Sequence, residues 1–190
     1  FCQAAGGSVV AYRHLLFAGV MAVTAALVIV LRRAERSERL SFSMHAAQSR
    51  ASYLTFALGL TVATLCWSAW MTQWFVPRFH PGWVFTSVYF TALGLMFIAA
   101  WVRWEKGVQG KIHDIAAYGM ASLMPIVPAV LVMQTHFPMG VRYVCGAVCA
   151  VQIMLLCLLI FVPAMRRRFL VYQLAYIALT FTALLTVTYA

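Results

Sequence analysis

Hydrophobic residues are gathered into six long runs along this chain, and polar residues are concentrated between them. The connecting segments contain charged residues, proline or glycine, and the runs cover approximately residues 15–31, 53–76, 83–102, 115–137, 141–165 and 169–189. A helix of about 20 apolar residues crosses a hydrocarbon layer of about 30 Å. The pattern predicts an all-α polytopic membrane protein, a compact bundle of six transmembrane helices that forms one domain over residues 1–190.

Composition supports this interpretation. Of the 190 residues, 64% are hydrophobic and 9% are charged, whereas a soluble domain is about 45–50% apolar and about 25% charged. The mean hydropathy is +0.89. Because six spans use nearly the whole chain, no separate soluble domain is expected.

Basic residues indicate the orientation of the bundle. The net charge is +10, and eleven of the 14 Lys and Arg residues fall after the first, third and fifth runs, namely Arg32, Arg33, Arg36, Arg39, Arg50, Arg103, Lys106, Lys111, Arg166, Arg167 and Arg168. The positive-inside rule then predicts cytoplasmic placement of these connections and both termini outside. We expect a bacterial-type inner membrane, with attraction to anionic headgroups on the cytoplasmic side. Nucleic-acid binding is not expected, because the basic residues lie at the ends of spans.

Hydroxyl residues recur along one face of the second predicted span. They are Thr61, Thr64, Ser68 and Thr72, and the opposite face carries Trp67, Trp70 and Trp74. We expect the hydroxyls to face the bundle and the tryptophans to face lipid. The hydroxyl face would serve packing or line a pore, and Gln152, near the middle of the fifth span, is expected to bond across helices. No Asp, Glu, Lys or Arg falls within the span interiors, which argues against a proton-driven transporter or a retinal protein.

A histidine and an aspartate stand side by side before the fourth predicted span. Asp114 directly precedes residue 115, where we expect the helix to begin, so the carboxylate is interpreted as an N-cap. His113 and His45 of the first loop are expected on the same side of the membrane, where two histidines could hold a haem or, with Asp114, a metal. The ligand spacing of a metal motif is missing, so no metal site or cofactor is predicted, and haem remains an alternative.

Two stretches carry a family resemblance. LSFSMHAAQSRASYLTFALGL and GKIHDIAAYGMA resemble parts of the six-helix membrane proteins of unknown function related to the damage-regulated autophagy modulator and Sfk-type group. The resemblance covers about the central half of the chain. It implies a serine in the first loop, matched by Ser41 or Ser43, and a histidine at the head of the fourth span, matched by His113, in a lipid-associated protein. The relatives are expected to place the first loop outside, whereas the basic first loop here predicts the cytoplasm.

Three functions remain open from the sequence. The first is a non-enzymatic membrane protein that binds lipid or acts as an accessory subunit, alone, as a homo-oligomer or with a membrane-protein partner. Its candidate headgroup or partner site is Ser41, His45, His113 and Asp114. The second is a small transporter or channel lined by the hydroxyl face of the second span, and the third is a haem or metal redox protein that uses His45 and His113. No motif identifies a catalytic residue, so an enzymatic activity is not predicted.

Overall fold

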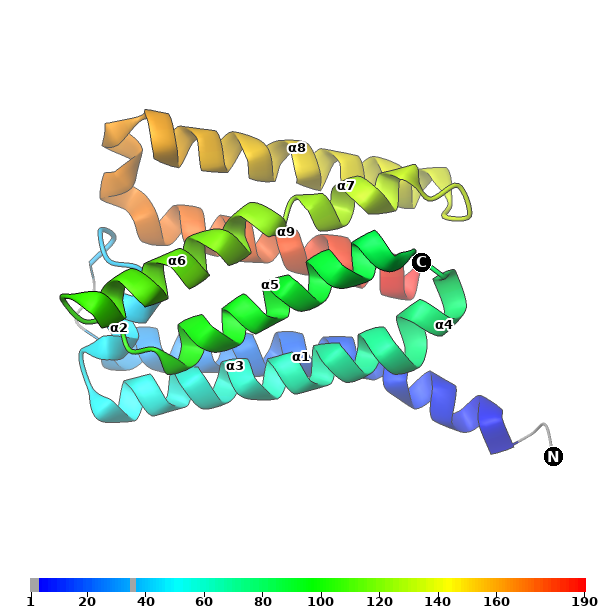
Figure 1. Ribbon diagram of the computed structural model, residues 1–190, viewed down its shortest axis with the longest axis horizontal. Helices are drawn as coiled ribbons and strands as arrows, with labels where there is room; N and C mark the ends of the chain where they lie inside the picture. Colours follow the sequence, from blue (N-terminus) through cyan, green and yellow to red (C-terminus); the bar gives the residue numbers. More distant parts are fainter. Residues whose placement is uncertain (1–3, 35–36) are drawn as a thin grey trace.

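The structure is a computed structural model, and it describes residues 4–34 and 37–190, with side chains described from residue 11 onward. Arg36, one of the basic residues of the first loop, lies outside the described residues. The described chain is helical, and no strand occurs in it (Figure 1). Its elements are α1 (Ala4–Arg33), α2 (Phe42–Ala47), α3 (Arg50–Trp70), η1 (Met71–Phe75), α4 (Val76–Phe79), α5 (Trp83–Trp101), α6 (Val108–Leu123), α7 (Ile126–Met133), α8 (Met139–Phe161), η2 (Pro163–Arg168) and α9 (Phe169–Tyr189).

Six helices are long and apolar enough to cross a membrane, which confirms the predicted fold class. Three are single α-helices, α1, α5 and α8. The other three are composite: α3 continues through the π-helical turn η1 into α4, α6 continues past a break into α7, and the 3₁₀ turn η2 leads into α9. The six cross the molecule in alternating directions, with α2 lying at one end (Figure 1).

The described connections rich in arginine and lysine all lie at one end of the bundle (Figure 1). At this end, which we call the basic end, α1, α5 and α8 finish and α3, α6 and α9 begin. Both the start of α1 and the end of α9 lie at the opposite end. The alternating placement of charge predicted from the sequence therefore corresponds to the two ends of the bundle.

The fourth membrane helix begins earlier than the sequence predicted. Gly107 precedes it with φ of 107°, a backbone conformation that favours glycine, and α6 starts at Val108. Asp114 therefore lies in the second turn of α6, and its interpretation as the N-cap is wrong. The polar residues Gln109, Lys111, His113 and Asp114 obscured this start. Hydropathy marks where a helix enters hydrocarbon, whereas the helix itself extends into the polar layer.

The predicted orientation of the second span is also wrong. Trp67, Trp70 and Trp74 are buried in the bundle, whereas Thr72 is exposed and Thr61, Thr64 and Ser68 are only partly buried. The threonine hydroxyls bond to carbonyl oxygens of their own helix, Thr61 to Ala57 and Thr64 to Leu60 at 2.8 Å, and Thr72 to Ser68 at 2.9 Å. Because these donors are satisfied locally, the hydroxyls can lie on the outer side of the helix. The large indole rings instead fill the interior.

Helices α1 and α3 pack closely against each other. A Cβ atom built on Gly59 would lie 2.4 Å from the Cβ of Ala26 and 3.3 Å from the carbonyl oxygen of Ala22. The four-residue spacing of alanines on α1 thus permits close approach at Ala22 and Ala26, while Ala18 is exposed. Trp67 reinforces the pair, since its Nε1 donates to the carbonyl of Leu16 at 3.1 Å.

The break between α6 and α7 is produced by proline. Pro125 lacks the N–H that would bond to the carbonyl of Ala121. Tyr176 of α9 supplies the missing donor, because its hydroxyl bonds to the Ala121 oxygen. The break is thereby compensated by a neighbouring helix, as backbone inside hydrocarbon requires.

Helices α8 and α9 are the least buried of the membrane helices. Helix α8 packs mainly against α7 and α9, and its outer face carries exposed Tyr143, Met154 and Phe161. This surface is apolar, as expected of a face in contact with lipid.

We predict that Gly59→Ala lowers the free energy of unfolding by about 1–3 kcal/mol, the usual cost of overpacking. Gly94→Ala is the matched control, because a Cβ there meets no atom within 4 Å. The control should be neutral or slightly stabilising. Unfolding in detergent micelles titrated with sodium dodecyl sulfate measures both, and equal effects of the two substitutions would contradict the close packing of α1 on α3.

Tyr176→Phe should cost about 1 kcal/mol, because it leaves the carbonyl of Ala121 without a donor. In a Pro125→Ala background the restored backbone N–H can serve that carbonyl, so the cost should shrink. The same unfolding assay provides this double-mutant cycle, with Tyr118→Phe on the exposed face of α6 as the control. A cost unaffected by Pro125→Ala would mean that the tyrosine acts elsewhere.

Candidate functional site

The serines of the first loop organise the short helix α2 at the basic end. Ser41 is the N-cap of this helix, and its Oγ accepts the backbone N–H of Met44 at 3.2 Å and lies 2.9 Å from Oγ of Ser43. Phe42, the first residue of α2, is buried. Its backbone N–H donates to Oε1 of Gln173 on α9 at 3.0 Å. The predicted site residue Ser41 therefore has a structural role as the cap of α2, and Phe42 attaches this helix to α9.

His45 is completely buried and connects α2 to the preceding loop. Its Nδ1 lies 2.8 Å from the carbonyl of Ser41, to which it can only donate, and its Nε2 lies 3.4 Å from the backbone nitrogen of Ser37, from which it accepts. This arrangement requires the neutral ring with its proton on Nδ1. Both ring nitrogens of His45 are thus occupied by the backbone of its own loop.

His113 has a different set of partners. Its ring is almost completely buried, and Nδ1 donates to the carbonyl of Val102 at 2.8 Å. The bond ties the second turn of α6 to the C-cap residue of α5. Asp114, the next residue, is partly buried. The structure thus places His45 and His113 in two separate backbone contacts, one with the first loop and one with the end of α5.

Arg103 connects these parts of the basic end, a role that no pattern in the sequence indicated. Its Nη2 donates to the carbonyl of Ala47 at 2.6 Å, Nη1 lies 3.5 Å from Oε1 of Glu105, and the guanidinium lies 6.0 Å from the centre of the Tyr53 ring. The Tyr53 hydroxyl in turn donates to the carbonyl of Trp101 at 2.6 Å. Arg103 and Tyr53 therefore join the end of α2, the start of α3 and the end of α5.

A groove lies beside this assembly, between the end of α1, the first loop and the start of α9. Its volume is about 570 Å³, and it is lined by Val28, Leu31, Arg32, Ser37, Glu38, His45 and Leu170. The backbone N–H of Leu170 donates to the carbonyl of Glu38 at 3.0 Å, which fixes the loop to α9. The groove combines an apolar wall from the membrane helices with polar and charged groups from the loop.

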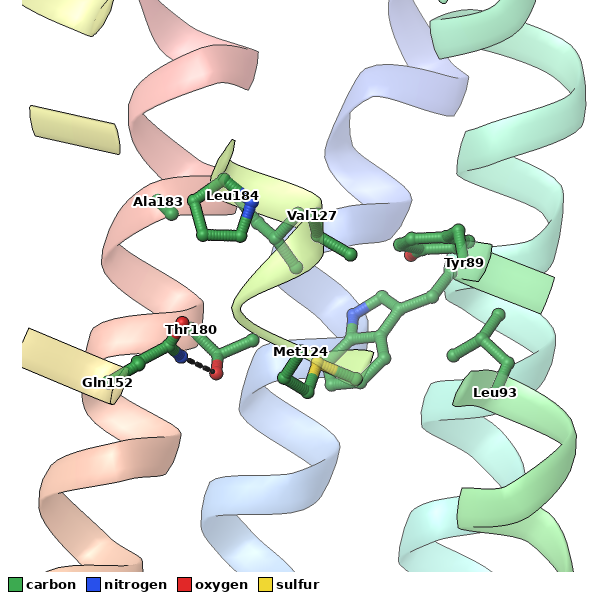
Figure 2. A pocket seen from close by; sticks show the side chains of 10 residues that line it. Tyr89, Leu93, Met124, Val127, Gln152, Thr180, Ala183 and Leu184 are labelled. Carbon is green, nitrogen blue, oxygen red and sulfur yellow. Dashed lines mark hydrogen bonds between the residues drawn. The ribbon is translucent and has the colours of Figure 1, made fainter. Parts of the chain in front are cut away.

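A second, much smaller cavity lies inside the bundle, next to the α6–α7 break (Figure 2). Its volume is about 20 Å³, and most of its lining is apolar. Gln152 of α8 reaches it and donates through Nε2 to Oγ1 of Thr180 on α9 at 2.8 Å. Thr180 donates onward to the carbonyl of Tyr176 at 3.1 Å. The structure therefore places Gln152 in a bond across helices, away from the hydroxyl residues of α3.

Two polar atoms of the cavity lining are buried and have no hydrogen-bond partner among the described residues. They are Oε1 of Gln152 and the hydroxyl of Tyr89 on α5. Tyr89 was not singled out in the sequence, because a tyrosine within an aromatic run resembles an ordinary packing residue. Only the fold shows that Tyr89 and Gln152 line the same cavity.

Among the residues that the structure describes, no three His, Cys, Asp or Glu side chains gather in a way that could hold a metal ion. Comparison with family models, curated proteins and solved structures finds no match to this chain.

The hydrogen bonds of the two histidines lead to a test of the haem alternative. Nε2 of His45 is occupied by Ser37 and both Nδ1 atoms by carbonyls, so we predict that haem added to the purified protein gains no pair of imidazole ligands. An absorption spectrum during haem titration measures this. A low-spin spectrum with two imidazole ligands that disappears in His45→Ala and His113→Ala would contradict the prediction.

Proposed function

We propose that this chain is a non-enzymatic integral membrane protein that binds anionic phospholipid in the groove at its basic end. The observation that carries the proposal is the pairing of an apolar wall with an arginine, Arg32, in one groove at the basic end. Val28, Leu31 and Leu170 would contact an acyl chain, and Arg32 with Ser37 would contact the phosphate.

Charge at the groove favours an anionic headgroup. Glu38 also lines the groove, and its carboxylate opposes an anion. Exposed arginines at the same end outnumber it, namely Arg32, Arg33, Arg39, Arg167 and Arg168. Each arginine near a membrane surface contributes about 1 kcal/mol to the attraction of anionic lipid. Glu38 would favour headgroups that carry an amine or a hydroxyl beside the phosphate, because these can bond to its carboxylate.

Orientation is part of the same proposal. Ten of the 13 Lys and Arg residues in the described part of the chain lie at the basic end of the bundle. By the positive-inside rule this end would lie in the cytoplasm, where a bacterial-type inner membrane supplies anionic lipid. In this arrangement α2 and the first loop would lie at the level of the inner headgroups. Ser41 and His45 then support the binding surface by holding the backbone of α2 and of the first loop, and His45 also lines the groove directly. His113 instead holds α6 to the residue after α5.

The alternative of a transport path along the hydroxyls of α3 has less support. Thr72 is exposed and the other three hydroxyl residues are only partly buried. A path lined by them would run along the outside of the bundle, unless a second protein covered it.

The proposal predicts that phosphatidylglycerol raises the melting temperature of the detergent-purified protein more than phosphatidylcholine does. Arg32→Gln should weaken the apparent affinity for phosphatidylglycerol about fivefold, corresponding to about 1 kcal/mol. Arg78→Gln is the matched control, because Arg78 is an exposed arginine at the opposite end. Lipid titrations followed by thermal melting give these affinities.

A second variant separates the groove from the general positive charge of the surface. Val28→Trp fills the groove without changing the charge, and it should also weaken phosphatidylglycerol binding. Binding that responds to Arg32→Gln and Arg78→Gln alike, or that is indifferent to Val28→Trp, would overturn the proposed site.

A further inference from the structure

We propose that His45 binds the lipid phosphate in the groove when its imidazole carries a proton, so that anionic lipid and a proton bind together at the basic end. The inference rests on the proposed function, because it adds a residue to the same groove and gives the condition under which that residue takes part in binding.

Protonation affects the two ring nitrogens of His45 differently. Nδ1 donates to the carbonyl of Ser41 at 2.8 Å, and a protonated ring can make the same bond. Nε2 accepts the backbone N–H of Ser37 at 3.4 Å, which is longer than the usual range of about 2.7–3.2 Å. A protonated ring loses this second contact, because both nitrogens of an imidazolium are donors. Proton uptake therefore keeps the ring attached to the start of α2 and releases it from Ser37.

The released position suits an anionic oxygen. The backbone nitrogen of Ser37 lies only 3.4 Å from Nε2 of His45, so a small outward movement of the loop makes room for one oxygen that accepts from both N–H groups. Ser37 and His45 both line the groove, and so does Arg32. A phosphate oxygen there would replace one long contact with two charge-assisted hydrogen bonds.

The burial of His45 couples the proton to the anion. The side chain is 0% exposed, and a buried imidazolium is unfavourable unless an anion pairs with it. Among the described residues that line the groove, Glu38 is the only acidic one, and it is exposed to solvent. A phosphate beside Nε2 would supply the counter-charge, so the proton and the lipid each favour the binding of the other.

The other charges near the groove have the same effect. The charged groups on the elements around His45 are Arg32 of α1, Glu38 and Arg39 of the first loop, Arg50 of α3, Arg103 after α5 and Arg168 of η2. All of them except Glu38 are cations. An additional positive charge on His45 is therefore most favourable when an anion occupies the groove.

The affinity for phosphatidylglycerol at different pH values tests the proposal. Ordinary imidazole takes up its proton near pH 6.5, whereas arginine and the lipid phosphodiester keep their charges between about pH 8 and about pH 5.5. The affinity of the full chain should rise about tenfold over this range, the effect of one added charge-assisted hydrogen bond. His45→Gln should bind with an affinity that hardly depends on pH.

His113→Gln is the matched control. His113 is another buried histidine at the basic end, but it bonds to the carbonyl of Val102 and is not in the groove lining. This variant should keep the tenfold rise in affinity.

Nuclear magnetic resonance of the unmodified protein with isotope-labelled histidine keeps the test decisive if His45→Gln does not fold. Bound phosphatidylglycerol should move the midpoint of the His45 titration upward by about one pH unit, which is the linkage counterpart of a tenfold change in affinity. The His113 signal should respond little to the lipid. Single histidine substitutions assign the two signals.

The outcomes separate this proposal from the lipid groove itself. An affinity that stays constant or falls between about pH 8 and about pH 5.5 would overturn the role of His45, and so would a His45 titration that ignores the lipid. A rise that persists in His45→Gln would assign the effect to Glu38 and also overturn it. Binding that depends on Arg32 and not on pH would leave the groove intact, whereas an absence of phosphatidylglycerol binding at every pH would refute the groove.

Discussion

Inside hydrocarbon no water is available to pair with a backbone N–H or C=O, so each of these groups must find its partner within the protein. Regular helices meet this demand except at their ends and breaks, where carbonyls remain free. In this protein cationic and imidazole side chains from neighbouring segments occupy many of those positions. The pairs, each given as side chain and carbonyl, are Arg13 with Thr188, Arg103 with Ala47, His113 with Val102, Arg142 with Val132, and Arg166 with Ile160.

This use of charge gives the basic residues two functions. A guanidinium at the end of a helix satisfies a carbonyl and also interacts favourably with the negative end of the helix dipole. Arg32, Arg39 and Arg168 remain exposed at the basic end, and there they can attract anionic headgroups. One of these exposed arginines, Arg32, lines the proposed lipid groove.

The pattern of hydropathy was sufficient to predict the six spans, because burial in lipid selects apolar residues all around a helix. It could not predict the start of α6, since most of residues 109–114 are polar and yet helical. It also reversed the faces of α3, because a threonine hydroxyl can bond to its own helix and leave the interior to Trp67 and Trp70. The partners of His45 and His113 are backbone N–H and C=O groups, and groups that nearly every residue carries leave no signal in the sequence.

The candidate sites were predictable only in part for a related reason. Ser41, His45 and Gln152 stood out as polar residues in unusual places, and each has a specific hydrogen bond in the structure. Arg103 and Tyr89 acquire their roles from helices that are distant in the sequence, so only the fold could show them.

The shallow burial of α8 and α9 has a consequence for the history of the chain. A side chain that touches only lipid is selected for being apolar, and leucine, isoleucine, valine and phenylalanine meet that requirement about equally well. Exposed positions such as Ile153, Ile160 and Val171 are therefore free to exchange among these residues over evolutionary time. In this part of the protein, relatives would share the few positions that bond or pack inward, such as Gln152 and Tyr176. The sequence of the outer surface would diverge.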